Sequence, residues 1–301
     1  MGVPSIETIA ARLADSLRHV PSVGHVADEI EDRLDRLPTD FNEYGYDPWG
    51  LNRDVVARTT LIAALWYRHW FRVETHDIER MPHGRVLIIA NHAGQIAIDA
   101  VMLGTAMLLE AEPPRIVRGM GEYWLPTVPF VNVIMVRMGS VVGTRKNCVD
   151  LLQAYEAVIA FPEGVRGMNK LFSQRYQLQE FGLRFMRLAL ETNTPIVPVA
   201  IVGSEEQAPA IANVHWLARV LRMPAFPVTL TWPHLGLLGM IPFPVKYHIY
   251  FGEPMRFEGY YNDGDDVIGE KVEVVKQRIQ SMLAAGLEAR ERRGRFLGIF
   301  R

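Results

Sequence analysis

The chain contains the stretch Val86-Leu87-Ile88-Ile89-Ala90-Asn91-His92, in which an uninterrupted apolar run leads into a histidine. Such a run predicts a strand that is buried on both faces of a sheet. Asp99 follows His92 after a short interval. A buried strand that delivers an imidazole to the edge of a sheet can position a general base, and a nearby carboxylate can orient that base.

A second stretch is built in the same way. The apolar run Ala157-Val158-Ile159-Ala160-Phe161 leads into Pro162-Glu163-Gly164-Val165-Arg166. If both strands are parallel, their carboxyl ends open onto the same edge of the sheet, where α/β proteins bind their ligands. The two charged turns would then face one crevice, and this arrangement favours an enzyme.

The composition narrows the class of protein. The chain has 301 residues, 49% of them hydrophobic, which is enough to bury a substantial core. A net charge of −2 argues against a nucleic-acid-binding surface. Cys148 is the single cysteine, so no internal disulfide can form and we expect a reducing compartment. The amino terminus lacks the apolar core of a signal peptide, and no window offers the ~20 apolar residues of a membrane span.

Predicted strands and helices alternate from Val73 onward, which favours an α/β fold with a mainly parallel central sheet flanked by helices. We expect a helical segment over residues 1–72, an α/β domain over 73–293 and a basic, aromatic tail over 294–301. The predicted strands lie near 85–90, 115–118, 140–143, 157–161, 196–202 and 247–251. The predicted helices lie within 5–36 and at 54–72, 150–155, 181–191 and 265–293.

Two segments have a composition that suits a membrane surface. In residues 59–72 an apolar run is followed by tryptophan and tyrosine interleaved with arginine, which is typical of a headgroup region and equally of a core helix capped by arginines. Residues 223–245 carry almost no charge and several prolines, which exclude a regular spanning helix. This second segment is either a buried irregular loop, the wall of an apolar pocket or a membrane-dipping element.

The spacing of His92 and Asp99 constrains the backbone between them. In a continuous α-helix the two residues would share a face but lie roughly 10 Å apart, too far for a hydrogen bond. Their pairing therefore requires a turn after His92, and Gly94 permits one. The other histidines show no spacing typical of a zinc site, so we expect no bound metal.

Cations follow two of the predicted strands. Arg145 and Lys146 come after a short strand that ends near Gly143, and Arg166 comes after Glu163. The planar guanidinium of arginine suits bidentate phosphate binding, and a glutamate accepts a hydrogen bond from a hydroxyl. The spacing of the glycines excludes a nucleotide-binding P-loop. Taken singly, each motif is also compatible with a solvated pair of charges or a simple turn.

Together and in this order, the motifs resemble those of the glycerolipid acyltransferase family, which includes lysophosphatidate and glycerol-3-phosphate acyltransferases. The resemblance covers roughly residues 68–292. Four motifs carry it: Asn91-His92 with Asp99, Gly139 to Arg145, Phe161-Pro162-Glu163-Gly164 with Arg166, and Val197-Pro198.

The resemblance implies a glycerol-3-phosphate acyltransferase-like fold and a fatty acyl transfer to a glycerolipid hydroxyl, in phospholipid biosynthesis or remodelling. The donor would be acyl-coenzyme A or acyl carrier protein, without a metal or redox cofactor, and the enzyme would sit on the cytoplasmic face of a membrane. His92 would be the general base and Asp99 its orienting partner. Arg145 would hold the phosphate of the acceptor. The acceptor's hydroxyl and phosphate would be positioned by Glu163, Gly164 and Arg166.

The chain departs from the family pattern at two places. Six residues separate His92 from Asp99 where four are usual, and Val165 replaces the usual threonine. The two arginines favour lysophosphatidate as the acceptor. The longer first motif leaves open a neutral alcohol such as diacylglycerol, or a catalytically silent lipid-binding protein of the same fold. A serine lipase is disfavoured because no Gly-x-Ser-x-Gly elbow is present.

Overall fold

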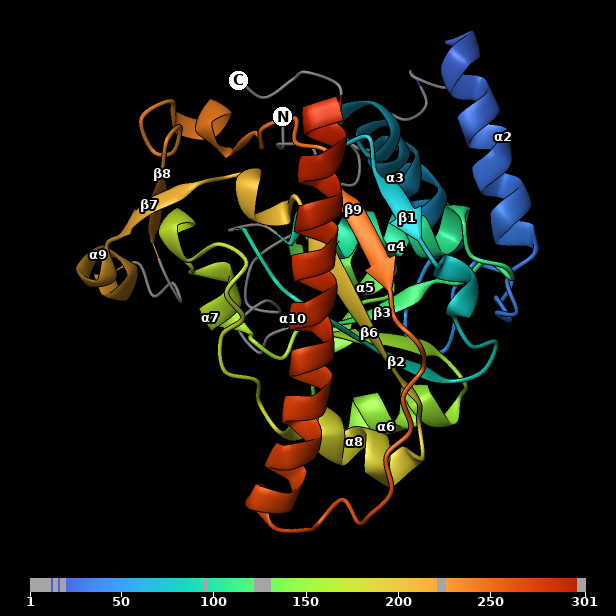
Figure 1. The fold of residues 1–301 in the computed structure, drawn as a ribbon. Coiled ribbons are helices and arrows are strands. Elements are labelled where there is room, and N and C mark those ends of the chain that lie inside the picture. Colours follow the sequence, from blue (N-terminus) through green and yellow to red (C-terminus); the bar gives the residue numbers. More distant parts are fainter. Residues whose placement is uncertain are drawn as a thin grey trace.

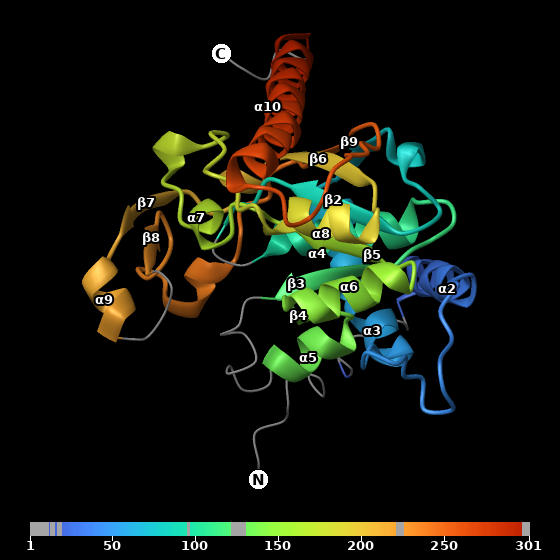
Figure 2. The same cartoon turned by 90° about the horizontal axis from the view of Figure 1, so that it is seen from below.

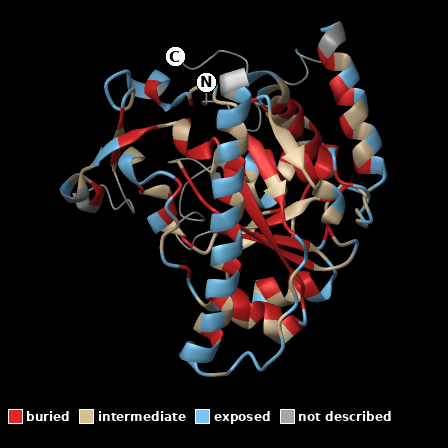
Figure 3. Ribbon diagram, in the orientation of Figure 1, coloured by how far each residue is buried: buried red, intermediate tan, exposed pale blue. Residues whose placement is uncertain are grey.

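In the computed structural model of the chain, the apolar run before Asn91 forms strand β2 (Val86–Ala90). Every residue of β2 is buried, because helices cover both faces of the sheet that contains it (Figure 3). The structure describes residues 20–94, 97–121, 131–220 and 226–296, together with Arg12 and Ser16. Most of residues 5–19 and the end of the predicted tail at 297–301 therefore lie outside the described residues.

Among the described residues, β2 belongs to a seven-stranded sheet with the order β1-β9-β6-β2-β5-β3-β4 (Figure 1). Its neighbours β5 and β6 both run parallel to it, and β6–β9 is the antiparallel pair of the sheet. The predicted mainly parallel sheet is therefore confirmed. The other strands of the sheet are β1 (Glu74–His76), β3 (Val117–Gly121), β4 (Val141–Val142), β5 (Ala157–Ala160), β6 (Ile196–Val202) and β9 (His248–Phe251).

Helices pack on both faces of the sheet (Figures 1 and 2). One face is covered by α6 (Arg145–Gln153), α8 (Arg184–Thr192) and α10 (Asp265–Phe296), which share a core with β2 and β6. The other face is covered by α4 (Ile98–Leu109) and by the short aromatic π-helix η1 (Trp66–Trp70). The helices α2 (Pro21–Asp35) and α3 (Arg53–Leu65) pack against the end of α4 and form a third cluster.

The remaining elements are short. A two-stranded antiparallel sheet is formed by β7 and β8 beside the main sheet. The bounds of the remaining elements are β7 (Ala210–Asn213), β8 (Pro227–Thr229), α5 (Val131–Arg137), α7 (Val165–Met168), α9 (His215–Val220), η2 (Ile78–Arg80), η4 (Phe172–Gln174), η5 (Ser204–Glu206) and η6 (Gly236–Met240). Within the described part of the chain, no helix is long and apolar enough to cross a membrane.

Pro198 lies inside the sheet, although a proline usually indicates an edge strand or a bulge. Its neighbour β9 leaves the ladder after Phe251, where the amide of Gly252 still donates to the Pro198 carbonyl. Pairing on this side resumes at Met255, whose amide donates to the Ile196 carbonyl. The missing N–H of Pro198 therefore faces the interruption between these two contacts.

Candidate active site

The structure brings His92 and Asp99 together. The chain turns sharply after β2, with Gly94 at a φ of 85° that glycine adopts without steric cost. Helix α4 begins at Ile98, so Asp99 lies in its first turn. His92 Nδ1 is 2.8 Å from Asp99 Oδ2, and both side chains are buried. The turn that the spacing requires is confirmed.

Every oxygen of the Asp99 carboxylate is engaged. Oδ2 also accepts a hydrogen bond from the amide of Ala93 at 2.9 Å, and Oδ1 accepts one from the amide of Ala100 at 2.8 Å. The amino end of α4 adds a favourable dipole for a negative charge. The protein therefore holds a carboxylate in one orientation against the imidazole, which favours the tautomer with a proton on Nδ1.

The other nitrogen of the imidazole is available. The ring of His92 stacks on the ring of Phe161, which directly follows β5, with 4.1 Å between the ring centroids. This contact fixes the plane of the imidazole. Among the described residues, Nε2 has no hydrogen-bond partner. An imidazole with Nδ1 held by a carboxylate and Nε2 unengaged can accept a proton from a bound hydroxyl.

The side chain of Asn91 links the turn after β2 to β6, the neighbouring strand of the sheet. Its side-chain amide donates to the Ile201 carbonyl at 3.0 Å, and its side-chain oxygen accepts from the Ile201 amide at 2.7 Å. The asparagine thereby continues the ladder between β2 and β6 beyond the last residue of β2. His92 is delivered from a rigid strand end.

Glu163 lies beside His92 but its carboxylate is held by the protein. Oε1 accepts a hydrogen bond from the backbone amide of His92 at 3.0 Å, and Oε2 accepts one from the amide of Gln179 at 2.8 Å. Lys170 Nζ lies 3.2 Å from Oε2. The Glu163 carboxylate is buried. Its hydrogen bond with the His92 amide joins the turn after β5 to the turn after β2.

Lys170 and Glu205 complete this network, and sequence reasoning missed both. Lys170 Nζ is 2.8 Å from Glu205 Oε1, and Glu205 Oε2 accepts a hydrogen bond from the amide of Tyr176 at 2.7 Å. Burial raises the pKa of Glu205, and the Lys170 ammonium opposes that rise. Neither residue lies in a recognisable motif, so no pattern in the sequence could have identified the pair.

Two glycines let α7 approach the turn that follows β2. Gly164 precedes α7 at a φ of 53°. A Cβ at Gly167 would lie 2.8 Å from Glu163 Cβ and 3.0 Å from the His92 carbonyl oxygen, which is too close for any other residue. Arg166 is carried by the same turn of helix, and its guanidinium binds Glu180 at 2.7 Å on the surface.

Arg145 has different surroundings. It begins α6, and its Nε binds Glu191 Oε2 at 2.9 Å while its guanidinium lies 5.1 Å from the ring centroid of Tyr261. Among the described residues, Arg145 therefore pairs with Glu191 and Tyr261, and no contact joins its guanidinium to His92 or Asp99.

An apolar cavity of about 430 Å³ opens near the ends of β3 and β4. Neither His92 nor Asp99 lines it. Its walls come from the loop before α3, from α5 and from the two strand ends, and they comprise Tyr46, Gly50, Gly121, Asn132, Val133, Met135, Val136, Arg137, Ser140, Val141 and Val142. Because β2, β5, β3 and β4 are parallel, this cavity lies toward the same edge of the sheet as His92.

Comparison with known proteins identifies related chains. The family model described as Acyltransferase matches residues 72–202, a range that contains His92, Asp99 and Glu163. An uncharacterized protein of Mycobacterium leprae is 36% identical over 283 residues, which are 92% of this chain and 74% of that protein. One of Mycobacterium tuberculosis is 36% identical over 255 residues, covering 82% of this chain and 70% of the relative.

More distant similarity extends to a eukaryotic enzyme and to a solved structure. A mouse protein named "DGAT1/2-independent enzyme synthesizing storage lipids" is 26% identical over 75% of this chain and 65% of its own length. The crystal structure of the 1-acyl-sn-glycerophosphate (LPA) acyltransferase PlsC from Thermotoga maritima superposes with a TM-score of 0.50 at 16% identity. That superposition covers 92% of this chain and 95% of PlsC, and it shows a shared fold. With a matching family model around the His92–Asp99 pair and relatives along most of its length, the chain belongs to the acyltransferase family and is an acyltransferase.

Proposed function

We propose that the enzyme transfers a fatty acyl group from an acyl thioester, either acyl-coenzyme A or acyl carrier protein, to a hydroxyl of a glycerolipid acceptor. The buried His92–Asp99 pair carries this proposal, because its geometry suits a general base for a hydroxyl. The favoured acceptor is lysophosphatidate, and the name of the PlsC structure supports this choice.

In the proposed step, the acceptor hydroxyl donates its proton to His92 Nε2 as its oxygen attacks the thioester carbonyl. The Asp99 carboxylate stabilises the imidazolium that forms. The tetrahedral intermediate then expels the thiolate as the C–S bond breaks, and the imidazolium returns the proton to the sulfur. The products are an ester and a free thiol. Because the acceptor oxygen attacks the thioester directly, the proposed reaction does not use a nucleophilic side chain of the enzyme.

The experiment that tests the proposed function measures free thiol released from oleoyl-coenzyme A by the purified protein. Lysophosphatidate, glycerol 3-phosphate, lysophosphatidylcholine and diacylglycerol are compared as acceptors. Release that depends on one acceptor identifies the substrate. The same panel is repeated with an acyl carrier protein donor. Silence with all acceptors and both donors would contradict the proposal and favour a catalytically silent lipid-binding protein.

A neutral alcohol such as diacylglycerol is the second candidate acceptor. The name of the mouse relative, which refers to storage lipids, supports it. The interval between His92 and Asp99 supports it too, because it is longer than the usual one. Diacylglycerol has no phosphate, so its use would not require Arg145 or Arg166.

For a phosphorylated acceptor, we propose that Arg166 and Arg145 bind the phosphate and that Glu163 and Gly164 shape the site. Arg166→Ala is expected to raise the KM for lysophosphatidate by roughly 10–100-fold, the value of a charge-assisted hydrogen bond. Arg145→Ala should also raise it, and each arginine must first leave its carboxylate, Glu180 for Arg166 and Glu191 for Arg145. Steady-state kinetics with lysophosphatidate and diacylglycerol measures both effects.

The matched control for these variants is Lys146→Ala, which removes the neighbouring exposed cation of α6. It should leave the KM unchanged. An unaltered KM for lysophosphatidate in both arginine variants would contradict their assignment to the phosphate.

We also propose that the enzyme works on a membrane surface, which is where its lipid substrates reside. The described part of the segment 223–245 is not a buried loop: Leu238 is 71% exposed, and other large apolar side chains near it are exposed too. Trp70 Nε1 donates to the Pro242 carbonyl at 3.1 Å, so η1 adjoins this segment. We call the resulting group the apolar surface, and it comprises Trp66, Trp70, Leu235, Leu238, Met240 and Ile241.

Replacing Leu235 and Leu238 together by serine is expected to reduce binding to anionic lipid vesicles at least tenfold. Full burial of a leucine side chain contributes about 1.5–3 kcal/mol to binding, and a tenfold change in affinity corresponds to about 1.4 kcal/mol. Even partial insertion of the two leucines therefore accounts for a tenfold effect. Cosedimentation with phosphatidylglycerol vesicles at low salt measures the effect. The control is the double change of Val267 and Val274 to serine, which removes exposed apolar side chains from α10. Wild-type protein that stays in the supernatant would refute the membrane proposal.

A further inference from the structure

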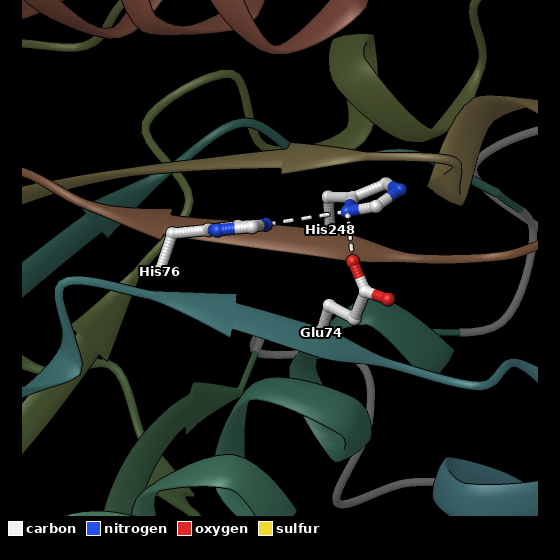
Figure 4. A group of neighbouring side chains, drawn as sticks. All are labelled: Glu74, His76 and His248. Atoms are coloured by element: carbon white, nitrogen blue, oxygen red, sulfur yellow. Dashed lines mark hydrogen bonds and ion pairs between the residues drawn. The ribbon is translucent and has the colours of Figure 1, made fainter. Parts of the chain in front are cut away.

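A second cluster of titratable side chains lies on the edge of the sheet. Strands β1 and β9 pair in parallel, with Glu74 opposite His248 and His76 opposite Tyr250. Alternate residues of a strand project from one face, so these side chains share a face of the sheet. Figure 4 shows Glu74, His76 and His248 converging between the two strands. We propose that these three side chains form a binding site for one divalent transition-metal ion of the zinc class.

The separations of the donor atoms suit such an ion. His76 Nε2 is 3.3 Å from His248 Nδ1, and His248 Nδ1 is 3.3 Å from Glu74 Oε2. All three donor atoms lie within 4.8 Å of one another. A tetrahedral zinc ion with bonds near 2.0–2.1 Å keeps its ligands about 3.3–3.4 Å apart. Two of the three separations already match this value, and a water molecule would complete the coordination.

The ring nitrogens of His76 and His248 already face each other and share one proton in a hydrogen bond, so metal binding requires this proton to leave or a ring to change tautomer. Tyr250 stacks on His76 with 4.3 Å between the centroids and 10° between the planes, so the ring is oriented without a ligand. Imidazoles with one carboxylate favour zinc, copper or nickel over magnesium and calcium.

Two cations compete for the carboxylate. Lys246 contacts Glu74 Oε1, and Arg293 Nη1 lies 2.7 Å from Glu74 Oε2. An ion bound to Oε2 would displace Arg293, whose side chain is 58% exposed and free to move into water. Lys246 could keep its contact with Oε1. Arg293 lies near the end of α10, so metal binding and this contact of α10 exclude each other.

This site is separate from the proposed chemistry. In the strand order, β9 and β6 stand between β1 and β2, which precedes His92. The inference therefore does not depend on acyl transfer. Its consequence is local: the metal links β1 to β9 and replaces an ion pair between β1 and α10.

Isothermal titration of the chelator-treated, tag-free full chain with Zn²⁺ tests the proposal, and Co²⁺ serves as a spectroscopic probe. We expect one ion per chain, visible absorption typical of tetrahedral Co²⁺, and no binding of Mg²⁺. His76→Ala should weaken binding by roughly 100-fold or more, because losing even an outer-shell partner costs 10–100-fold. Glu74→Gln is the second variant, since both side chains are only partly buried and the variants should fold.

Two further variants distinguish a metal site from a plain hydrogen-bond network. Arg293→Ala removes the competing cation and should tighten Zn²⁺ binding, whereas a network without metal predicts no gain. His234→Ala, which removes an exposed histidine elsewhere, should change nothing. Wild-type affinity equal to that of His76→Ala, or Zn²⁺ binding that Arg293→Ala leaves unchanged or weakens, would overturn the proposal.

Discussion

Replacing His92 by alanine is expected to lower kcat by about 10²–10⁴-fold while leaving the fold intact. This is the usual contribution of a general base. The side chain is buried against Phe161 and bonds only to Asp99 among the described residues, so its loss opens a small space beside the turn. The thiol-release assay with the identified acceptor measures kcat, and circular dichroism reports on folding.

Asp99→Asn is the companion variant, because it keeps the shape of the side chain. Oδ1 of Asp99 accepts from Ala100, and Oδ2 accepts from both Ala93 and His92. An asparagine amide must turn its NH₂ toward one of these sets of donors, so it either displaces the imidazole proton or leaves an amide unpaired. Activity should fall with it as well. A folded His92→Ala enzyme with unchanged kcat would refute the general-base role.

Replacing Lys170 by methionine is expected to lower the free energy of unfolding by about 3–5 kcal/mol, the usual penalty for removing one partner of a buried ion pair. The side chain is buried between the carboxylates of Glu163 and Glu205, at 3.2 and 2.8 Å. Without the ammonium, two buried carboxylates face each other uncompensated. Urea denaturation monitored by tryptophan fluorescence measures the loss.

The loss should depend on pH in a defined direction. Burial already raises the pKa of Glu205 in the folded protein, and removing Lys170 removes an opposing effect. A carboxyl whose pKa is raised by folding stabilises the protein while protonated, and this stability is lost as the pH rises through the folded-state pKa. The variant should therefore be less destabilised at pH 5 than at pH 8.

Two controls frame this experiment. Lys146→Met removes an exposed lysine of α6 and should change stability by no more than about 0.5 kcal/mol. Glu205→Gln added to Lys170→Met should recover part of the loss, because it removes one buried charge. Equal stability of Lys170→Met and wild type at pH 8 would contradict the network described here.

Much of the central sheet was predictable because its strands are buried on both faces. The runs that became β2, β5 and β6 are continuous and apolar, and the structure places each within two residues of its predicted position. Strand β1 was missed, since it has three partly buried residues and too few positions for a pattern. Helix α6 begins at Arg145, earlier than expected, because Thr144 caps it by accepting from the Asn147 amide at 3.1 Å.

The sequence by itself determined the local order: a buried strand, then His92, then a turn permitted by Gly94, then Asp99. His92 and Asp99 are only seven positions apart, so the local sequence was enough to predict their hydrogen bond. The tertiary structure alone decided which distant groups meet. It directs Arg145 to Glu191, places Lys170 between two carboxylates, and joins His76 to His248 across 172 positions. Such contacts depend on strand order and register, which a short motif does not encode.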